Sequence, residues 1–299
     1  MTSRDSAGRG IRILQKDMLL WIQGFAASWL DTLMIAFSFV GDEEFYVATV
    51  PLIYYLISKR AGVRLAIVLA MSTFVNYALK VFFNAPRPIG VEGIRSLYVE
   101  SAPSMSFPSG HAQGSATYWG YLATQVRKPW FYGLAGFMVL SIMLSRLYLG
   151  VHWPIDVAAG LVFGLLFVAG MVWADGRMTE RPLSFGVKLA LGIALPLLLL
   201  LVYHEADGRK MVGFLLGCWS GYVLESHTIR MALPKSIWQR ILPSLVGVAI
   251  LFGLRALLKD VLPLSAPWDL VRYLLVGLTA TLAIPWLFVK LRWYPRGTA

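Results

Sequence analysis

Long apolar runs alternate with short polar stretches along the whole chain. A window of about 20 residues, the length that crosses a hydrocarbon core about 30 Å thick, finds about ten candidate helices. We place them near residues 18–40, 43–58, 62–83, 109–126, 130–147, 154–174, 184–203, 209–228, 237–257 and 269–290. The pattern predicts an all-α fold, a polytopic transmembrane helix bundle of about ten spans.

The first of these runs is interrupted by polar and flexible residues. Gln23, Gly24 and Asp31 fall inside the range 18–40. Residues 11–26 therefore have an alternative, an amphipathic helix that lies along the membrane surface.

Composition places the chain among integral membrane proteins. Hydrophobic residues make up 58% of it and charged residues only 14%, against roughly 25% charged in soluble domains. A net charge of +11 could indicate a nucleic-acid partner, but the 27 Lys and Arg residues fall in short clusters between apolar runs. We interpret them as topology signals and expect no nucleic-acid partner.

The same cations predict which membrane face each loop occupies. With ten spans threaded in order, most of the Lys and Arg residues fall on one side, and the acidic run Asp42, Glu43, Glu44 falls on the other. The positive-inside rule then makes both termini cytoplasmic. The loop 84–108 and the junction 146–153 face outward. The short loops favour a bacterial inner or plasma membrane.

Three polar stretches meet on that outward face. They are KVFFNAPRP from Lys80 to Pro88, PSGH from Pro108 to His111, and SRLYLGVHWPID from Ser145 to Asp156. Each falls at a predicted helix end, so helix packing could gather them. We expect a functional site at this point.

The first chemical feature of these stretches is positive charge. Lys80, Arg87 and Arg146 lie close to a low-dielectric boundary, where cations are costly unless they meet an anion such as phosphate. Ser109 is a good N-cap, and it places Gly110 and His111 in the first turn of a helix. Free backbone N–H groups and the helix dipole favour an oxyanion there.

The second chemical feature is a pair of histidines. Pro154 suits the first turn of a helix, which leaves His152 just outside it and Asp156 about one turn further in. The carboxylate can hold one ring nitrogen and raise the nucleophilicity of the other, so His152 is the candidate nucleophile. His111 has no partner nearby in sequence, and we expect it to be free to act as a general acid.

The combined pattern K-x6-RP, PSGH and SR-x5-H-x3-D resembles the signature of the type 2 phosphatidic acid phosphatase superfamily, which includes glucose-6-phosphatase and vanadium haloperoxidases. The resemblance covers roughly residues 15–175, a core of about six helices. It implies hydrolysis of a phosphomonoester or diphosphate without a metal or cofactor.

The resemblance also assigns roles within the site. It implies that the phosphoryl oxygens are bound by Lys80, Arg87, Ser109, Gly110 and Arg146. It implies that His152 forms a phosphohistidine, that Asp156 orients His152, and that His111 protonates the leaving group and then activates water.

Residues 1–175 are expected to form this catalytic core with an N-terminal cytoplasmic or interfacial segment, and 176–299 to add transmembrane helices of unknown role. Gly213, Gly217, Gly221 and Glu225 share one helix face, which indicates close helix packing. We expect Glu225 to form a structural ion pair with the nearby Arg230 or His227. In the outer loop, Glu92, Arg95 and Glu100 are expected to be solvated.

The expected partners are the bilayer and a lipid phosphate substrate, since 11 tryptophans and an interfacial site suit an amphiphile. Candidates implied by the family are polyprenyl diphosphate, phosphatidic acid, phosphatidylglycerophosphate and long-chain-base phosphates. A lipid phosphotransferase that uses the same intermediate, a transporter or flippase, and a vanadate-dependent haloperoxidase are the alternatives. No oligomeric state is predicted.

Overall fold

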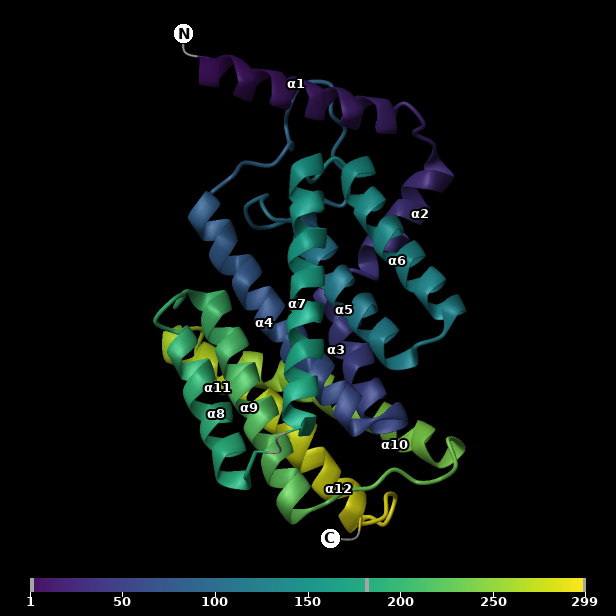
Figure 1. Cartoon of the computed structure of the whole chain (residues 1–299), viewed down its shortest axis with the longest axis vertical. Coiled ribbons are helices and arrows are strands. Elements are labelled where there is room, and N and C mark those ends of the chain that lie inside the picture. Colours follow the sequence, from purple (N-terminus) through teal and green to yellow (C-terminus); the bar gives the residue numbers. More distant parts are fainter. Residues whose placement is uncertain (1–2, 181–182, 298–299) are drawn as a thin grey trace. The chain divides into compact units, whose positions relative to one another are not determined.

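A computed structural model describes residues 3–180 and 183–297, and these residues are almost entirely helical (Figure 1). The helices are α1 Ser3–Gln23, α2 Ser28–Phe39, α3 Glu43–Leu52, α4 Lys59–Phe83, α5 Gly110–Val126, α6 Pro129–Tyr148, α7 Pro154–Glu180, α8 Phe185–Leu199, α9 Ala206–Thr228, α10 Trp238–Val261, α11 Ala266–Leu278 and α12 Ile284–Lys290. Two π-helical turns, η1 Ile53–Ile57 and η3 Thr279–Ala283, and the 3₁₀ turn η2 Val99–Ser101 complete them. The all-α prediction is confirmed for the described residues. The two chain ends, predicted to be cytoplasmic, lie partly outside them.

The chain divides into two compact units that are interleaved in sequence. The first unit comprises Met1–Phe45 and Val75–Ala169, and the second comprises Tyr46–Phe74 and Gly170–Ala299. The boundaries fall inside α3, α4 and α7, so no single point along the chain separates the units.

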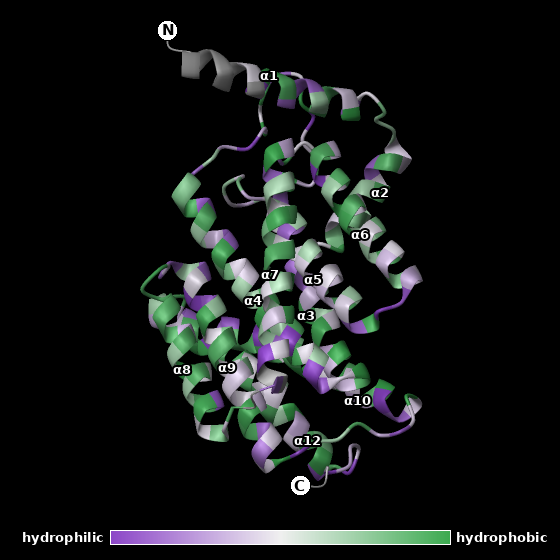
Figure 2. Ribbon diagram, viewed as in Figure 1, coloured by the Kyte–Doolittle hydropathy of each residue, from purple (hydrophilic) through white to green (hydrophobic). Residues whose placement is uncertain are grey.

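Five helices of the described residues are long and apolar enough to cross a membrane, and a bent pair brings the number to six. The five are Lys59–Phe83, Pro129–Tyr148, Pro154–Arg177, Trp238–Val261 and the composite Ala266–Lys290. Figure 2 shows their apolar character along the ribbon. Each of the ten predicted spans contains helix. By length and apolar composition, however, fewer than ten of the described helices could cross a membrane.

The predicted continuous helix over 18–40 is wrong. The chain bends by 118° between residues 12–23 of α1 and α2, with a break at residues 24–27. The Gln23 side chain explains the break, because its amide group accepts from Arg95 N and donates to the carbonyls of Arg95 and Tyr148. In the first unit α1 lies across the ends of α6 and α7 (Figure 1), and Trp21 on it is 70% exposed. This arrangement resembles the amphipathic alternative.

The loop 84–108, which we call the outer loop after its predicted position, is held by a small apolar cluster of the first unit. Met34, Ala102, Tyr148, Leu149 and Val151 are its buried members, and Leu97 and Tyr98 of the loop pack against it. Leu97 N also donates to Leu149 O at 2.9 Å. The loop that carries Arg87 is therefore fastened to α2 and to the C-terminal end of α6.

In the second unit, the predicted glycine face of α9 packs against α11. A Cβ atom on Gly213 or Gly217 would collide with the carbonyl oxygens of Leu270 and Leu274. Close backbone approach of this kind is what small residues spaced four apart permit. The helix-packing interpretation of the glycines is confirmed.

Glu225 forms a structural ion pair, but the predicted partners are wrong. The fully buried carboxylate lies 2.6 Å from Lys59 Nζ and accepts a hydrogen bond from Met231 N at 2.7 Å. Arg230 Nε instead donates to the His227 carbonyl. Lys59 was missed because it lies far away in sequence, and only the fold brings it to the end of α9.

Candidate active site

The three polar stretches converge within the first unit. Lys80 Nζ, at the end of α4, donates to the carbonyls of Met105 and Ser106 in the loop before α5. Ser109 N, at the start of α5, donates to the Asp156 carbonyl in α7 at 2.9 Å. Backbone and side-chain contacts therefore bring together the end of α4 and the starts of α5 and α7, and the expected convergence of the three stretches is observed.

His152 lies in the turn between α6 and α7 with a partner on each ring nitrogen. Its Nδ1 is 3.4 Å from Asp156 Oδ2, and its Nε2 is 2.9 Å from Arg87 Nη1. A guanidinium nitrogen can only donate, so Nε2 must carry the lone pair and Nδ1 the proton. The ring is 1% exposed. This is the tautomer in which Nε2 is nucleophilic.

Asp156 is held by more groups than the sequence indicates. Its Oδ2 accepts from Ser106 Oγ at 2.5 Å and from Trp153 N at 2.8 Å. Ser106 Oγ is also 3.4 Å from His152 Nδ1. Ser106 was missed, because it lies in the outer loop with no local spacing that links it to Asp156.

Burial and charge both act on the protonation of His152. Burial of the ring, together with the positive charges of Arg87, Arg146 and Lys80, lowers the pKa of His152 well below its ordinary 6.5. Burial also lowers the pKa of Arg87 to about 10. At neutral pH the site therefore combines a neutral imidazole with a guanidinium cation.

The three predicted phosphate-binding cations are held by backbone carbonyls and hydroxyls. Arg87 donates to the carbonyls of Ser104 and Val151 at 2.6 and 2.7 Å. Arg146 is fully buried and donates to the hydroxyls of Ser38 and Ser101. Its Nε is buried without a hydrogen-bond partner among the described residues. Uncharged acceptors leave most of this positive charge uncompensated, which suits an anionic ligand.

The PSGH stretch begins α5 as predicted. Ser109 is the N-cap, and its hydroxyl accepts from Ala112 N at 3.5 Å. Gly110 is the first helical residue, and a Cβ atom there would lie 3.3 Å from Asn76 Oδ1. That contact is tight, so a side chain at residue 110 would press on α4 beside the helix N-terminus.

His111 has a partner that lies far away in sequence. Its Nε2 lies 2.6 Å from Asp42 Oδ1, and Asp42 Oδ2 accepts a hydrogen bond from Tyr98 at 2.7 Å. Asp42 precedes α3 and is distant in sequence, so local spacing could not reveal it. The usable signal was that its acidic run falls on the same predicted membrane face.

Arg95 is also not simply solvated. It forms two hydrogen bonds of 2.8 and 2.7 Å with the Asp31 carboxylate and lies over the Tyr148 ring. Glu92 and Glu100 are exposed, as predicted. The ion pair joins the outer loop to α2, so Arg95 has a structural role.

Among the described residues, no group of three or more His, Cys, Asp and Glu side chains is placed to hold a metal ion. The polar groups around His152 are chiefly cations and hydroxyls, which suit an anion.

Known proteins are similar to this chain in sequence. The putative undecaprenyl-diphosphatase YbjG of Escherichia coli strain K12 is 30% identical over 158 residues, which cover 50% of this chain and 76% of that protein. The chain belongs to the PAP2 superfamily. The family model described as "PAP2 superfamily" matches residues 61–179, and "PAP2 superfamily phosphatase, transmembrane extension" matches residues 209–296.

Two further comparisons extend over more of this PAP2 chain. Lipid phosphate phosphatase delta of Arabidopsis thaliana is 26% identical over 64% of this chain, which spans about half, 49%, of that protein. The crystal structure of a transmembrane PAP2-type phosphatidylglycerolphosphate phosphatase from Bacillus subtilis aligns with a TM-score of 0.48 and 23% identity, covering 60% of this chain and 98% of that one. The protein is an integral membrane phosphatase of the PAP2 superfamily.

Proposed function

We propose that this protein dephosphorylates a lipid phosphate or diphosphate through a phosphohistidine on His152, without a metal. The observation that carries the proposal is the orientation of His152, whose Nδ1 faces Asp156 while its Nε2 faces the cation Arg87. An imidazole held in this way has its nucleophilic nitrogen directed at the place where a phosphoryl anion meets positive charge.

The phosphoryl group binds among Lys80, Arg87 and Arg146, assisted by the Ser109 hydroxyl and the Gly110 N–H at the start of α5. A helix N-terminus and uncompensated cations both favour an anion. Because Arg87 Nη1 contacts Nε2 itself, the incoming group must draw the guanidinium away from His152 before attack. Substrate binding therefore uncovers the nucleophile.

Attack by Nε2 forms a P–N bond as the bond to the leaving oxygen breaks. Asp156 stabilises the positive charge that the ring acquires, as in other His–carboxylate pairs. The three cations stabilise the charge on the equatorial oxygens of a loose transition state. His111 protonates the leaving oxygen, and then removes a proton from the water that hydrolyses the intermediate.

The topology and location belong to the same proposal. About ten spans with both termini cytoplasmic would put the site on the extracytoplasmic face of a bacterial inner membrane. We propose that residues 1–175 form the catalytic core and that 176–299 add further helices. The added glycine-lined contact between α9 and α11 supports a well-packed extension rather than a linker.

The substrate class follows from the membrane setting and the relatives. Those named above act on undecaprenyl diphosphate and on lipid phosphates by their names. Polyprenyl diphosphate, phosphatidic acid and phosphatidylglycerophosphate all present a phosphate at the interface while their tails remain in lipid. The residues of the proposed site would bind only the phosphate, so they suit all three lipids.

The test is phosphate release by the purified protein from these three lipids, with a chelator in place of divalent metal. We expect turnover of at least one lipid and a loss of about 1,000-fold or more in His152→Ala. His204→Ala, an exposed histidine of the second unit, is the matched control and should retain full activity. Substantial turnover by His152→Ala would remove the mechanism, and phosphate transfer to an added alcohol would identify the phosphotransferase alternative.

A further inference from the structure

A second Asp–His pair lies beside the proposed nucleophile. Asp42 is only 12% exposed and His111 13%, and their Oδ1 and Nε2 atoms are 2.6 Å apart. The other carboxylate oxygen accepts from the Tyr98 hydroxyl. Both oxygens of Asp42 therefore have donors, so the direction of the carboxylate toward His111 is fixed.

Tyr98 is itself tied to the phosphate-binding residues. The Tyr98 carbonyl accepts a hydrogen bond from the Ser101 hydroxyl at 2.7 Å. The Ser101 hydroxyl in turn accepts one from Arg146 Nη1 at 2.8 Å. Burial and the hydrogen bond to Asp42 raise the pKa of Tyr98 to about 12. Tyr98 thus remains a donor at any ordinary pH, and it links Asp42 to the segment that binds Arg146.

The electrostatics keep Asp42 ionised. Burial alone would raise the pKa of Asp42. It is outweighed by the hydrogen bond and charge of His111, by the Tyr98 hydroxyl and by the charge of Arg146, so the pKa of Asp42 lies below the ordinary 3.8. Burial of the ring and the positive charges of Arg146 and Arg87 disfavour the protonated form of His111, and the Asp42 carboxylate opposes them. Asp42 is the group among them that favours a protonated His111.

We propose that Asp42, held by Tyr98, is the positioning residue for His111 and serves the acid–base steps as Asp156 serves the nucleophile. This inference rests on the proposed function. With Nε2 directed at the carboxylate, Nδ1 is the nitrogen that exchanges a proton with the leaving oxygen and then with water. Asp42 stabilises the imidazolium that forms when His111 takes the proton of the attacking water.

The proposal predicts that loss of Asp42 affects the two chemical steps unequally. A lipid alcohol is a poor leaving group and needs an acid, whereas an aryl phosphate with an acidic phenol does not. In Asp42→Asn we expect kcat for the lipid phosphate to fall by about 100-fold or more, within the range for general acid–base catalysis. Phosphoenzyme formation from the aryl phosphate should stay near the wild-type rate, and hydrolysis of the intermediate should slow, so the phosphoenzyme should accumulate.

Rapid-quench kinetics of Asp42→Asn, Tyr98→Phe and Glu44→Gln measure these rates. Tyr98→Phe keeps the carboxylate and should show the same pattern more weakly, which covers the case in which Asp42→Asn does not fold. Glu44→Gln changes a neighbouring exposed acid and should match the wild type. If Asp42→Asn lowers the reaction rate equally for the lipid phosphate and the aryl phosphate, and no phosphoenzyme accumulates, the proposed role of Asp42 is overturned. Absence of phosphoenzyme from the wild type would instead count against the proposed function itself.

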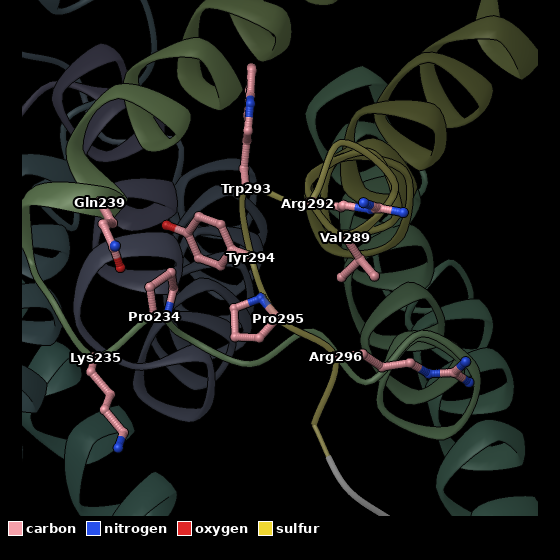
Figure 3. Close-up of a pocket in the computed structure, with 9 residues that line it drawn as sticks. All are labelled: Pro234, Lys235, Gln239, Val289, Arg292, Trp293, Tyr294, Pro295 and Arg296. Carbon is pink, nitrogen blue, oxygen red and sulfur yellow. The ribbon is translucent and has the colours of Figure 1, made fainter.

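An independent observation concerns a groove of about 740 Å³ in the second unit (Figure 3). It lies between the segment that leads into α10 and the segment that follows α12. Its lining residues are Pro234, Lys235, Gln239, Val289, Arg292, Trp293, Tyr294, Pro295 and Arg296. Three of the nine are cations and none is acidic.

The charge in this groove is not neutralised by the described residues. The side chains of Lys235 and Arg292 are exposed and form no hydrogen bond or ion pair within that part of the chain. Arg296 donates only to the Thr228 carbonyl, at 2.8 Å. A smaller adjoining pocket of about 200 Å³ shares Arg296 and adds a fourth cation, Lys290.

The surroundings favour a lipid over a free ion. Trp238, Leu291 and Trp293 near the groove are 79%, 47% and 38% exposed, and aromatic residues at helix ends are typical of the membrane interface. Basic pockets between transmembrane helices bind anionic head groups. We infer that this groove binds the phosphate of an anionic phospholipid whose acyl chains lie along the neighbouring helices.

Thermal unfolding of the full-length protein in nanodiscs tests this inference. We expect nanodiscs that contain phosphatidylglycerol to raise the melting temperature above that in phosphatidylcholine alone, and the triple variant Lys235→Gln, Arg292→Gln, Arg296→Gln to lose the difference. The control variant Arg12→Gln, Arg127→Gln, Lys128→Gln removes three exposed cations elsewhere and should keep it. An equal loss in both variants, or the same stabilisation by inorganic phosphate in phosphatidylcholine, would contradict a lipid site in the groove.

Discussion

His152 is placed by two neighbours of opposite kind, a carboxylate at Nδ1 and a guanidinium at Nε2. The sequence predicts the first from the spacing of His152 and Asp156 across a helix start, and it predicts the N-cap role of Ser109 in the same way. It does not predict Ser106 or Asp42, because both reach their partners from other segments. Local spacing identifies residues in the same turn, whereas contacts between distant segments depend on the fold.

The depressed pKa of His152 determines how activity depends on pH. A group whose pKa is lowered stays neutral at pH values at which a free imidazole is protonated, so the acid limb of kcat/KM should lie below pH 6.5. Arg87 contributes to this shift. In Arg87→Gln the loss of a positive charge raises the pKa of His152, and the acid limb should move to higher pH.

Measurement of kcat/KM against pH for the wild type and Arg87→Gln checks both statements. The variant is also expected to be slower at every pH, because Arg87 binds phosphate in the proposed mechanism. An acid limb that stays in place or moves to lower pH in Arg87→Gln would contradict the electrostatic interpretation.

At the level of helices and loops, the apolar pattern predicts the position of nearly every helix but not the break before α2. Gln23, Gly24 and Asp31 were visible as polar interruptions, yet their effect depends on Arg95 and Tyr148 from other segments. The glycine series on α9 was predictable, because its period of four residues is a property of one helix. The partner of Glu225 was not, since Lys59 comes from another helix.

The contact between α9 and α11 leaves no room for a side chain. We expect Gly217→Leu to destabilise the protein by about 3 kcal/mol or more, because overpacking against backbone cannot relax as it does against side chains. Gly253→Leu on α10 is the control, since nothing lies within 4 Å of its Cβ position. Thermal unfolding in detergent measures the difference, and equal stability of the two variants would refute the close approach of the helices.

The outer loop depends on the ion pair between Arg95 and Asp31. Both side chains are partly exposed, at 38% and 24%, and solvent screens such a pair, so we expect the two residues to be coupled only weakly. A double-mutant cycle with Arg95→Gln and Asp31→Asn measures this coupling as it acts on kcat/KM. The double variant should be little worse than either single one, and strictly additive losses in kcat/KM would show that the pair does not hold the loop.

At the level of the whole molecule, the sequence predicts the class of the protein far better than its subdivision. Apolar runs and a three-part motif are sufficient to indicate a membrane phosphatase of the PAP2 superfamily. The two compact units exchange segments at α3, α4 and α7, and nothing in the local pattern marks those exchanges. Hydropathy reports the environment of each helix, whereas the grouping of helices follows from contacts between residues that are distant in sequence.

The central claim is that Nε2 of His152 becomes phosphorylated during turnover. Its most direct test is to react the enzyme with a lipid phosphate that carries a radiolabelled phosphate group. The reaction is then quenched without acid, and the labelled peptide is mapped. We expect label that is stable to base and labile to acid on the peptide that contains His152, formed and lost at rates compatible with kcat, and none in His152→Ala. Label on another residue, or turnover by an enzyme that never becomes labelled, would contradict the mechanism.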